Sequence, residues 1–498
     1  MGEALMYALG SVFSFQSILF MVVAVILGII FGAIPGLSAT MAVALFLPIT
    51  YGMKAELGLS ILIALYIGAT SGGLISAILL KIPGTPSSVS TCFDGHPMVD
   101  KGQGPKALGV GIVFSFIGTI LSVAVLMLVA PRLARVAIKF GPHEYFAIAI
   151  FSLSLIAGLS KGSMLKGVFA GVLGIIFSTV GIAPIEGTVR FTFGNPELKS
   201  GFDTLTVMIG FFAITEILRT AENIKKSKRE DGVSVSMGDI KGFGFSLKEF
   251  KEQVPNALMS ALIGAGIGIL PGIGAGTSNL VSYSVSKNNS KKSELYGTGI
   301  IDGIVASETA NNANIGGSLI PLMTLGVPGD TVTAILLGGF MIHGVQPGPL
   351  LFQNNANLVY TIFVSMIFAS VIMLVLEFYG MRIFAKLLNV PKHILLPIIV
   401  VLCVVGAFGL NSRIFDVWTI LIFGILGYLF YRFKVPKTPF IMGFILGPML
   451  ETNFRRALML SDNSFLSFFK QPISAIFLSI ALVSLVVTFY RSIKSRKV

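Results

Sequence analysis

The sequence predicts an all-α polytopic integral membrane protein with about ten to thirteen transmembrane helices. Of its 498 residues, 54% are hydrophobic and only 12% are charged, about half the charged fraction of soluble domains. Charge-free apolar runs such as 17–31, 111–130 and 473–489 approach or reach the roughly 20 residues that cross a bilayer core. The short stretches of alternating polarity that build a β-barrel do not occur.

The charge distribution argues against a nucleic-acid partner and for the lipid bilayer. The net charge is +13, but the basic residues lie mainly in connecting loops and at the C-terminus, as in cytoplasmic loops of membrane proteins. Cys92 and Cys403 are too few for a disulfide framework or a cysteine-rich metal site. Residues 1–13 contain no Lys or Arg, so the first apolar run is expected to be retained as a helix.

A polar stretch divides the chain. We expect a first transmembrane repeat at 1–218, a cytoplasmic linker at 219–254, and a second repeat at 255–460. An extra helix and a basic tail, 461–498, complete the chain. The linker and the tail are placed in the cytoplasm because they are rich in Lys and Arg.

Two pairs of Pro-Gly steps interrupt hydrophobic segments at matching positions of the two halves. Pro35-Gly36 precedes Pro271-Gly272 by 236 residues, and Pro83-Gly84 precedes Pro328-Gly329 by 245. Paired, broken or re-entrant segments of this kind point to the binding site of a secondary transporter. If the N-terminus, with only Glu3 charged, lies outside and the linker lies in the cytoplasm, the first half crosses an odd number of times. We therefore expect the two structural repeats to be inverted. The basic loops 132–139 and 382–392 argue against inversion, because they fall at corresponding positions of the two halves.

Each break exposes backbone groups that can bind ions. Pro removes a donor and Gly permits a tight reversal, so helix N-termini become available to carboxylates. A packing kink is the simpler explanation for a single Pro-Gly step, but it fits four steps in repeated order poorly. The predicted substrate-binding residues are Pro35, Gly36, Ser38, Lys81, Gly84, Thr85, Ser87, Ser88, Gly272, Gly274, Thr277, Ser278, Gly329 and Thr331.

Hydroxyl, amide and carboxylate oxygens near the breaks suit a coupling cation, either Na⁺ or H⁺. Glu308 is an ionisable residue in a membrane segment, which marks a functional site by default, although it could instead lie near water. Lys81 could anchor a carboxylate or extend to the interface. Asp94 and Arg190 are further candidates, and Arg190 could bind a carboxylate bidentately or lie at the interface. The predicted cation-binding residues are Thr70, Ser71, Glu308, Asn311, Asn312 and Asn314.

The sequence lacks the motifs expected of an enzyme. Gly264–Gly266 lies in an apolar run without a preceding strand, so a dinucleotide site is disfavoured. No P-loop, HExxH or GxSxG motif occurs. The four histidines lack metal-ligand spacing. We therefore expect neither an enzyme, nor a metal, nor a cofactor beyond the coupling ion.

Several motifs resemble the large membrane subunit of the bacterial tripartite tricarboxylate transporter family. They are GAIPGL, PGTPSSVSTCFDGHPM, VRFTFGNPEL, LPGIGAGTSNL, ASETANNANIGG, LGVPGD and GVQPGP, spread from about residue 17 to 450. The resemblance implies a cation-driven importer of tricarboxylate- or dicarboxylate-like solutes in a bacterial inner membrane. It also implies a small four-helix membrane subunit and a periplasmic solute-binding protein as partners, and it favours the Pro-Gly segments and 308–314 as binding positions.

The chain departs from the family pattern at a few positions. Lys81 stands where the family usually has Asn before PGT, Asp302 and Ser307 alter the EGVxAPE run, and Ala183 replaces an acid. Lys81 could replace a bound cation or change the preferred anion.

The predicted mechanism is alternating access, with substrate held near the membrane midplane. A passive anion channel or permease without cation coupling is the alternative, and an intramembrane enzyme is a more distant one. The sequence leaves a homodimer open.

Overall fold

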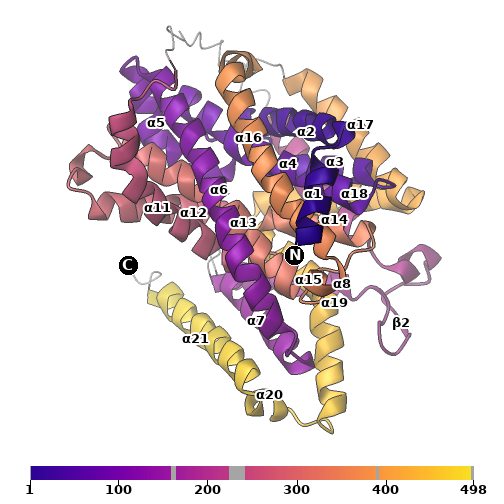
Figure 1. Cartoon of the computed structure of the whole chain (residues 1–498). Helices are drawn as coiled ribbons and strands as arrows, with labels where there is room; N and C mark the ends of the chain where they lie inside the picture. The colour runs from indigo at the N-terminus through magenta and orange to yellow at the C-terminus, as the bar shows by residue number, and fades with distance from the viewer. Residues whose placement is uncertain (1, 159–163, 224–241, 388–391, 495–498) are drawn as a thin grey trace. The chain divides into compact units, whose positions relative to one another are not determined.

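The computed structural model describes residues 2–158, 164–223, 242–387 and 392–494. These residues are mostly helical, with almost no sheet (Figure 1), which confirms the predicted all-α membrane fold. Part of the predicted linker, 224–241, and the end of the basic tail, 495–498, lie outside the described residues. The same holds for residues 388–391 of the second basic loop.

The chain divides into two compact units. The first unit contains 1–133, 219–270 and 274–402, and thus combines segments of both predicted halves. Its elements are α1 (Gly2–Val12), α2 (Phe15–Ala33), α3 (Ala39–Phe46), η1 (Leu47–Thr50), α4 (Ala55–Leu80), η2 (Pro86–Ser88), α5 (Thr91–Asp100), most of α6 (Gly104–Ala137), the end of α10 (Thr215–Asn223), α11 (Leu247–Ile269), α12 (Ala275–Asn289), η5 (Ser293–Leu295), α13 (Ile301–Leu325), α14 (Thr331–Ile342), α15 (Leu351–Asn354), α16 (Ala356–Leu387) and the start of α17 (Lys392–Asn411).

The second unit contains 134–218, 271–273 and 403–498. In it α19 packs against α7 and α8, and α21 packs against α7. A small antiparallel hairpin pairs Gly181 with Arg190. The elements of this unit are α7 (Pro142–Gly158), α8 (Met164–Ser178), β1 (Gly181–Ile182), β2 (Val189–Arg190), η3 (Pro196–Ser200), α9 (Thr204–Met208), the π-helical η4 (Ile209–Ile214), the start of α10, α18 (Ile414–Arg432), α19 (Lys437–Leu460), α20 (Ser467–Lys470) and α21 (Pro472–Lys494).

Six helical segments of the described residues are long and apolar enough to cross a membrane: Phe15–Ala33, Ala55–Leu80, Gly104–Ala137, Thr204–Glu222, Ala356–Met381 and Ile414–Arg432. Several shorter apolar helices accompany them. A broken helix can cross the membrane in two short pieces, and a criterion that requires a long helix misses such crossings. The predicted total of about ten to thirteen spans therefore stays a prediction.

The first unit contains the same helix pair twice. In the first half α2 packs on α4, and in the second half α11 packs on α13. Gly28 lies against the carbonyl of Leu65, and Gly264 lies against the carbonyl of Ala310. The glycines are 236 residues apart and their partners are 245 apart, which are the offsets of the Pro-Gly steps. Small residues allow this close backbone approach between membrane helices.

A second layer of contacts repeats in the same way. Gly84 lies against the carbonyl of Gly32, and Gly329 lies against the carbonyl of Gly268 so closely that a Cβ at Gly329 would be 2.5 Å from its oxygen. These partners are again separated by 245 and 236 residues. The broken segment of each half therefore folds back onto the same place of its helix pair. Whether the two copies are inverted in the membrane stays a prediction, as do the boundaries of the repeats.

Backbone angles at the breaks also recur. Ile34, which ends α2, has φ −80° and ψ 115°, and Leu270, which ends α11, has φ −82° and ψ 117°. Lys81 ends α4 with φ 57° and ψ 21°, while Gly326 ends α13 with φ 70° and ψ 18°. Pro cannot continue the hydrogen-bond ladder, so each helix ends shortly before its Pro-Gly step.

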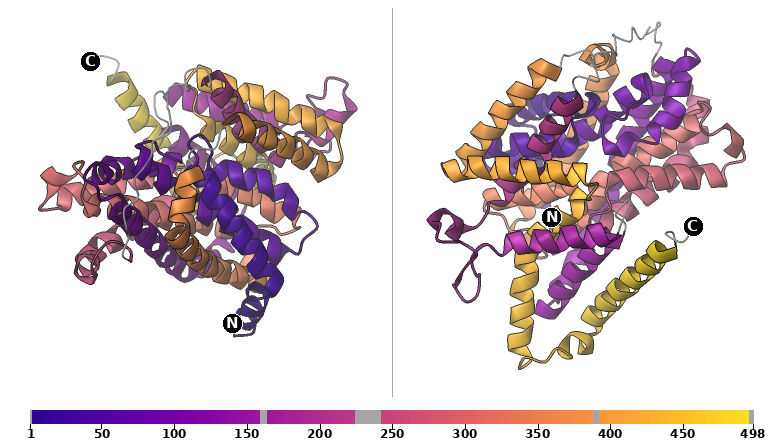
Figure 2. Two further views of the ribbon diagram at one scale, coloured as in Figure 1. Left: turned by 90° about the horizontal axis from the view of Figure 1, so that it is seen from above. Right: turned by 180° about the vertical axis from the view of Figure 1, so that it is seen from behind.

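The long helix α16 lies against α2 and α4, and α1 packs on α16 (Figure 2). Ser60 and Ser365 join α4 to α16 through a buried hydrogen bond of 2.7 Å. A further hydrogen bond between these two helices involves a carboxylate and is described below.

Candidate substrate and cation site

Helix N-termini from both halves meet in the first unit. Ser38 caps α3 by accepting a hydrogen bond of 3.2 Å from the Met41 amide. Thr40, in the first turn of α3, bonds through its hydroxyl to that of Thr331, the first residue of α14, at 3.1 Å. The starts of α3 and α14 therefore lie side by side, although 291 residues separate these two threonines.

The N-terminus of α12 completes this group. Gly274 caps α12 with φ 74° and no side-chain hydrogen bond. A Cβ at Gly274 would lie 3.6 Å from the Asp330 Cβ, and one at Gly276 would lie 3.0 Å from the Pro86 carbonyl. The start of α12 thus contacts both the N-cap of α14 and the short helix η2. Because its N-cap is a glycine, no side chain of the cap residue bonds to the amides of the first turn.

Asp330 organises the second-half break. Its Oδ2 accepts hydrogen bonds from Tyr66 (2.5 Å) and Asn314 (3.1 Å). Its Oδ1 accepts from the Thr333 amide and hydroxyl, both at 2.8 Å. In return, Thr333 Oγ1 accepts a bond from the Asp330 amide, which completes a capping box. Tyr66 and Asp330 are buried, and sequence reasoning did not select either as a site residue.

The first-half break has a similar cap made of hydroxyls. Thr85 is the N-cap of η2 and forms a capping box with Ser88. Ser87 bonds to Thr85 through its hydroxyl at 2.9 Å. Thr85 and Ser88 are buried, and Ser87 is half-buried. Because Thr85 precedes Asp330 by 245 residues, the repeat places a neutral cap in one half and an acidic cap in the other.

The predicted substrate residues thus differ in exposure. Lys81 is exposed, and no hydrogen bond or ion pair of its ammonium occurs within the described part of the chain. Gly272 has φ 74° and belongs to the second unit, where it lies against Ile156. The half-buried members of the first unit are Pro35, Gly36, Ser38, Ser87, Gly274, Thr277 and Thr331. Its buried members are Gly84, Thr85, Ser88, Ser278 and Gly329.

The predicted cation residues lie mainly on α13, and the structure buries them. Glu308 is fully buried and accepts hydrogen bonds from Thr91 on one oxygen and from Ser115 (3.2 Å) on the other. Asn312, one turn later, donates to the Glu308 carbonyl at 3.1 Å. Thr91 belongs to α5 and Ser115 to α6, so Glu308 joins the two halves.

Several buried oxygens near Glu308 have no donor. Among the described residues, the side-chain carbonyls of Asn311, Asn312 and Asn314 and the hydroxyl of Thr309 lack a hydrogen-bond partner. All four residues are fully buried. A buried acceptor without a partner costs about 1–3 kcal/mol, so a run of them on one helix requires an explanation. A cation that lacks its full water shell would provide one.

Thr70 and Ser71 on α4 face the same region. Asn311 donates to the Thr70 carbonyl at 3.4 Å. Ser71 donates at 2.7 Å to Glu377 of α16, a fully buried carboxylate that sequence reasoning missed. The signal was present: Glu377 directly follows the charge-free run 358–376, and an ionisable group inside a span marks a functional site.

Asp94 has a structural position. Its Oδ1 accepts from the amides of Gly297 (2.9 Å), Gly299 (2.8 Å) and Ile300 (3.1 Å), and its Oδ2 accepts from Tyr283 (2.9 Å). These amides lead into α13, so Asp94 fixes the start of the helix that carries Glu308. Its carboxylate oxygens are well supplied with donors.

Ser90 forms a further link that sequence reasoning did not select. Its amide donates to Asn279 Oδ1 at 2.9 Å, and its hydroxyl accepts from Ser307 at 3.0 Å. Asn279 also donates to the Ser307 carbonyl at 3.1 Å. The break of the first half is thereby fastened to α12 and α13 of the second.

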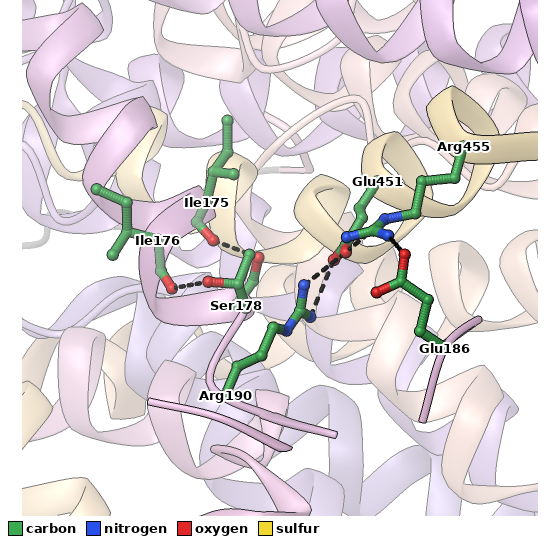
Figure 3. Close-up of polar contacts among 8 residues, drawn as sticks. Ile175, Ile176, Ser178, Glu186, Arg190, Glu451 and Arg455 are labelled. Carbon is green, nitrogen blue, oxygen red and sulfur yellow. Dashed lines mark hydrogen bonds and ion pairs between the residues drawn. The ribbon is translucent and has the colours of Figure 1, made fainter. Parts of the chain in front are cut away.

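Arg190 lies in the second unit and pairs with a carboxylate of the protein (Figure 3). Its two terminal nitrogens donate to Glu451 at 2.6 and 3.1 Å. Arg455 also pairs with Glu451, at 3.0 Å, and with Glu186. The bidentate geometry expected for Arg190 is present, but with Glu451 as its partner. A contact of Arg190 with substrate stays a prediction.

Comparisons with known proteins agree with the resemblance noted in the sequence. The model of the tripartite tricarboxylate transporter TctA family matches residues 18–442. An uncharacterised 52.8 kDa protein in the TAR-I ttuC′ 3′ region of Agrobacterium vitis is 36% identical over 475 residues, which cover 95% of this chain and 93% of that protein. A second uncharacterised protein, in the TAR-II ttuC′ 3′ region of the same organism, is 36% identical over 234 residues, 47% of this chain and 97% of the relative.

No solved structure matches the chain. The family is one of transporter subunits and not of enzymes, and its tripartite systems combine several subunits. With a family match over most of its length, the chain belongs to the tripartite tricarboxylate transporter TctA family and is a multi-pass membrane protein.

Proposed function

We propose that this chain is the membrane subunit of a secondary active importer, which moves a small carboxylate-bearing solute with a coupling cation. The observation that carries the proposal is the pairing of two kinds of binding group in one compact unit. Uncapped or hydroxyl-capped helix starts gather at 38–40, 85–88 and 274–277. Buried oxygens without donors follow along 309–314.

The helix starts supply the anion-binding part. Each N-terminus carries about half a positive charge on its free amides, and such ends bind carboxylates without a charged side chain. The half-buried state of Ser38, Gly274 and Thr277 fits a position that a solute can reach. The starts of α3 and α12 serve best, because the start of α14 already holds the Asp330 carboxylate. The short turn η2 contributes the hydroxyls of Thr85, Ser87 and Ser88 and no helix dipole.

The unpartnered oxygens supply the cation-binding part. Amide and hydroxyl oxygens, with carboxylates nearby, are hard ligands of the kind that coordinate Na⁺ in transporters with broken helices. A proton on Glu308 is the other coupling route. Since anion and cation positions belong to the same packed group of helices, binding of one favours the other by Coulomb attraction.

Transport then follows alternating access, in which the unit that carries both positions exposes them to one side at a time. The tripartite nature of the family supports a small four-helix subunit and a periplasmic solute-binding protein as partners. The bacterial inner membrane is the corresponding location, with the polar linker in the cytoplasm.

Uptake by purified, reconstituted protein tests the proposal. Radiolabelled citrate, as a tricarboxylate probe, and succinate, as a dicarboxylate, are offered to proteoliposomes under imposed Na⁺ or H⁺ gradients. The assay is run with and without a candidate binding protein. Accumulation that requires one gradient supports the proposal. If the probe accumulates to the same extent with and without either gradient, in the presence of the binding protein, cation coupling is contradicted.

The alternative is a passive anion channel or permease. Counterflow separates the two, because only a carrier drives labelled probe uphill when unlabelled probe leaves on the other side. A channel would show none. An intramembrane enzyme is disfavoured by the family, and cleavage of a lipid or peptide by the purified protein would revive it.

Lys81 is tested separately because its side chain is exposed and lies just before the Pro83-Gly84 step. We infer that it changes the coupling stoichiometry or the preferred anion. In Lys81→Asn we expect a changed sodium dependence or a changed ratio of citrate to succinate uptake. If both stay as in the wild type, Lys81 has neither role.

A further inference from the structure

We propose that Glu377 is the principal carboxylate ligand of a bound sodium ion, which it holds together with Ser71 and Asn311 in the core of the first unit. The proposal rests on the cation coupling proposed above and names the residue that supplies the charge. Glu377 lies on α16, a helix that contains no Pro-Gly step.

In the described part of the first unit, several acidic side chains are buried. Among its described residues the buried charged side chains are Asp94, Glu308, Asp330 and Glu377, and no Lys or Arg accompanies them. A buried carboxylate is stable only when donors or a positive charge compensate it. The four acids can therefore be ranked by the donors that reach them.

Three of the acids are well compensated. Asp94 accepts from three amides and a tyrosine hydroxyl. Asp330 accepts from Tyr66, Asn314 and Thr333 and lies at the start of a helix, where negative charge is stabilised. Glu308 accepts on both oxygens, from Thr91 and Ser115.

Glu377 is the exception. Ser71 donates to its Oε2 at 2.7 Å, but its Oε1 has no partner among the described residues although the side chain is fully buried. Glu377 also interacts electrostatically with Glu308. Two carboxylates near each other in a low-dielectric core cannot both stay charged without a cation.

Neutral oxygens occur next to Ser71, the residue that donates to this carboxylate. The Asn311 amide bonds through its nitrogen to the Thr70 carbonyl at 3.4 Å, which leaves its buried oxygen without a partner. Ser71, the next residue of α4, keeps oxygen lone pairs after donating to Glu377. The three proposed ligands thus come from three helices: Asn311 from α13, Ser71 from α4 and Glu377 from α16.

The ligand set favours a monovalent ion. Divalent ions such as Ca²⁺ take six to eight oxygens, commonly several carboxylates, and the described residues contain no cluster of three or more acidic, His or Cys side chains suited to a metal. One carboxylate with neutral hydroxyl and amide oxygens matches the single charge of Na⁺.

Sodium binding by purified protein without any carboxylate solute tests the proposal. Melting temperature is measured in detergent against NaCl, with choline chloride keeping ionic strength constant, because a ligand of the folded state stabilises it by mass action. We expect sodium-dependent stabilisation of the wild type. Glu377→Gln should lower the apparent sodium affinity at least about tenfold, which is about 1.4 kcal/mol. Asn311→Ala should lower it less.

Ser365→Ala is the matched control. Ser365 bonds to Ser60 at 2.7 Å and joins the same two helices, α4 and α16. It lies 12 residues from Glu377 on α16, which is about 18 Å along a helix. Removing this hydroxyl disturbs the same interface without touching the carboxylate, so its sodium affinity should equal that of the wild type.

The outcomes separate this inference from the proposed function. If Glu377→Gln keeps wild-type sodium affinity, or if melting responds to pH but not to sodium, Glu377 is not a sodium ligand, even when the wild type transports citrate. If Glu377→Gln does not fold, Asn311→Ala decides, and unchanged sodium affinity there overturns the proposal. Sodium binding without any carboxylate uptake would instead contradict the proposed function alone.

Discussion

Replacing Asp94 tests whether it is a structural residue or a ligand of the transported ions. Its carboxylate holds the turn that starts α13, through the amides of Gly297, Gly299 and Ile300, and it accepts the Tyr283 hydroxyl. In Asp94→Ala these donors lose their acceptor.

The magnitude follows from which donors are buried. Gly297 is exposed and can turn to water, whereas Gly299 and Tyr283 are buried and Ile300 is half-buried. At about 1–3 kcal/mol for each unsatisfied buried group, the two buried donors alone should cost the alanine variant about 2–6 kcal/mol of stability. Tyr283→Phe removes one bond and should cost about 1–2 kcal/mol. Asp94→Asn keeps an oxygen for the amides and should fall between them.

Thermal unfolding in detergent gives the order of the variants. We expect melting temperatures to fall from wild type through Tyr283→Phe and Asp94→Asn to Asp94→Ala. The fraction that stays folded should keep the wild-type KM for citrate, because Asp94 acts on the start of α13 and not on the solute. Wild-type stability of Asp94→Ala together with a raised KM would refute this reasoning and return Asp94 to the binding site.

Three further predictions concern other parts of the molecule. Gly264→Ala should melt well below the wild type because its Cβ would collide with the Ala310 carbonyl, whereas Gly266→Ala on the same helix, with open space around it, should be neutral or slightly stabilising. Arg190→Gln should lower stability without changing the KM for citrate, and a raised KM at unchanged stability would make it a substrate ligand. The Lys106 ammonium and Ser246 lower the pKa of Glu249, near the polar start of α11, to about 2. The stabilisation by that pair is therefore complete above about pH 4.5 and is lost as the pH falls from about 4.5 to 2. The melting temperature of Lys106→Met should lie below that of the wild type at pH 6, and the two should converge at about pH 2.

Much of the fold follows from local chemistry and could be predicted. Pro35 and Pro271 end their helices because a prolyl nitrogen cannot donate, so the sequence alone places both breaks. The offsets between the Pro-Gly steps also predict that the two halves repeat. They did not predict that Gly28 and Gly264 contact matching carbonyls, because such contacts depend on the partner helix.

The sequence predicts which kinds of residue form the candidate site, but it predicts their hydrogen-bond partners less well. Glu308 and the asparagines after it are polar residues in a membrane helix, and this pattern is visible in the sequence. Which carboxylate lacks donors is a property of the packed core. Thr91 and Ser115, from two other helices, donate to Glu308, whereas within the described part of the chain Glu377 accepts only from the Ser71 hydroxyl.

The two copies of the repeat have diverged in charge at equivalent positions. Asp330 caps one break with a carboxylate, and Thr85 caps the other with a hydroxyl. Lys81 adopts a left-handed conformation that Gly326 adopts in the other copy, at a cost of about 1–2 kcal/mol for a residue with a Cβ. Both differences make the break of the first half more positive than that of the second. An anion is stabilised where positive charge is not already neutralised, so the carboxylates of the solute should bind nearer to the first-half break. Asp330, the acid of the second-half break, should instead hold α14 to α4 through its hydrogen bond with Tyr66.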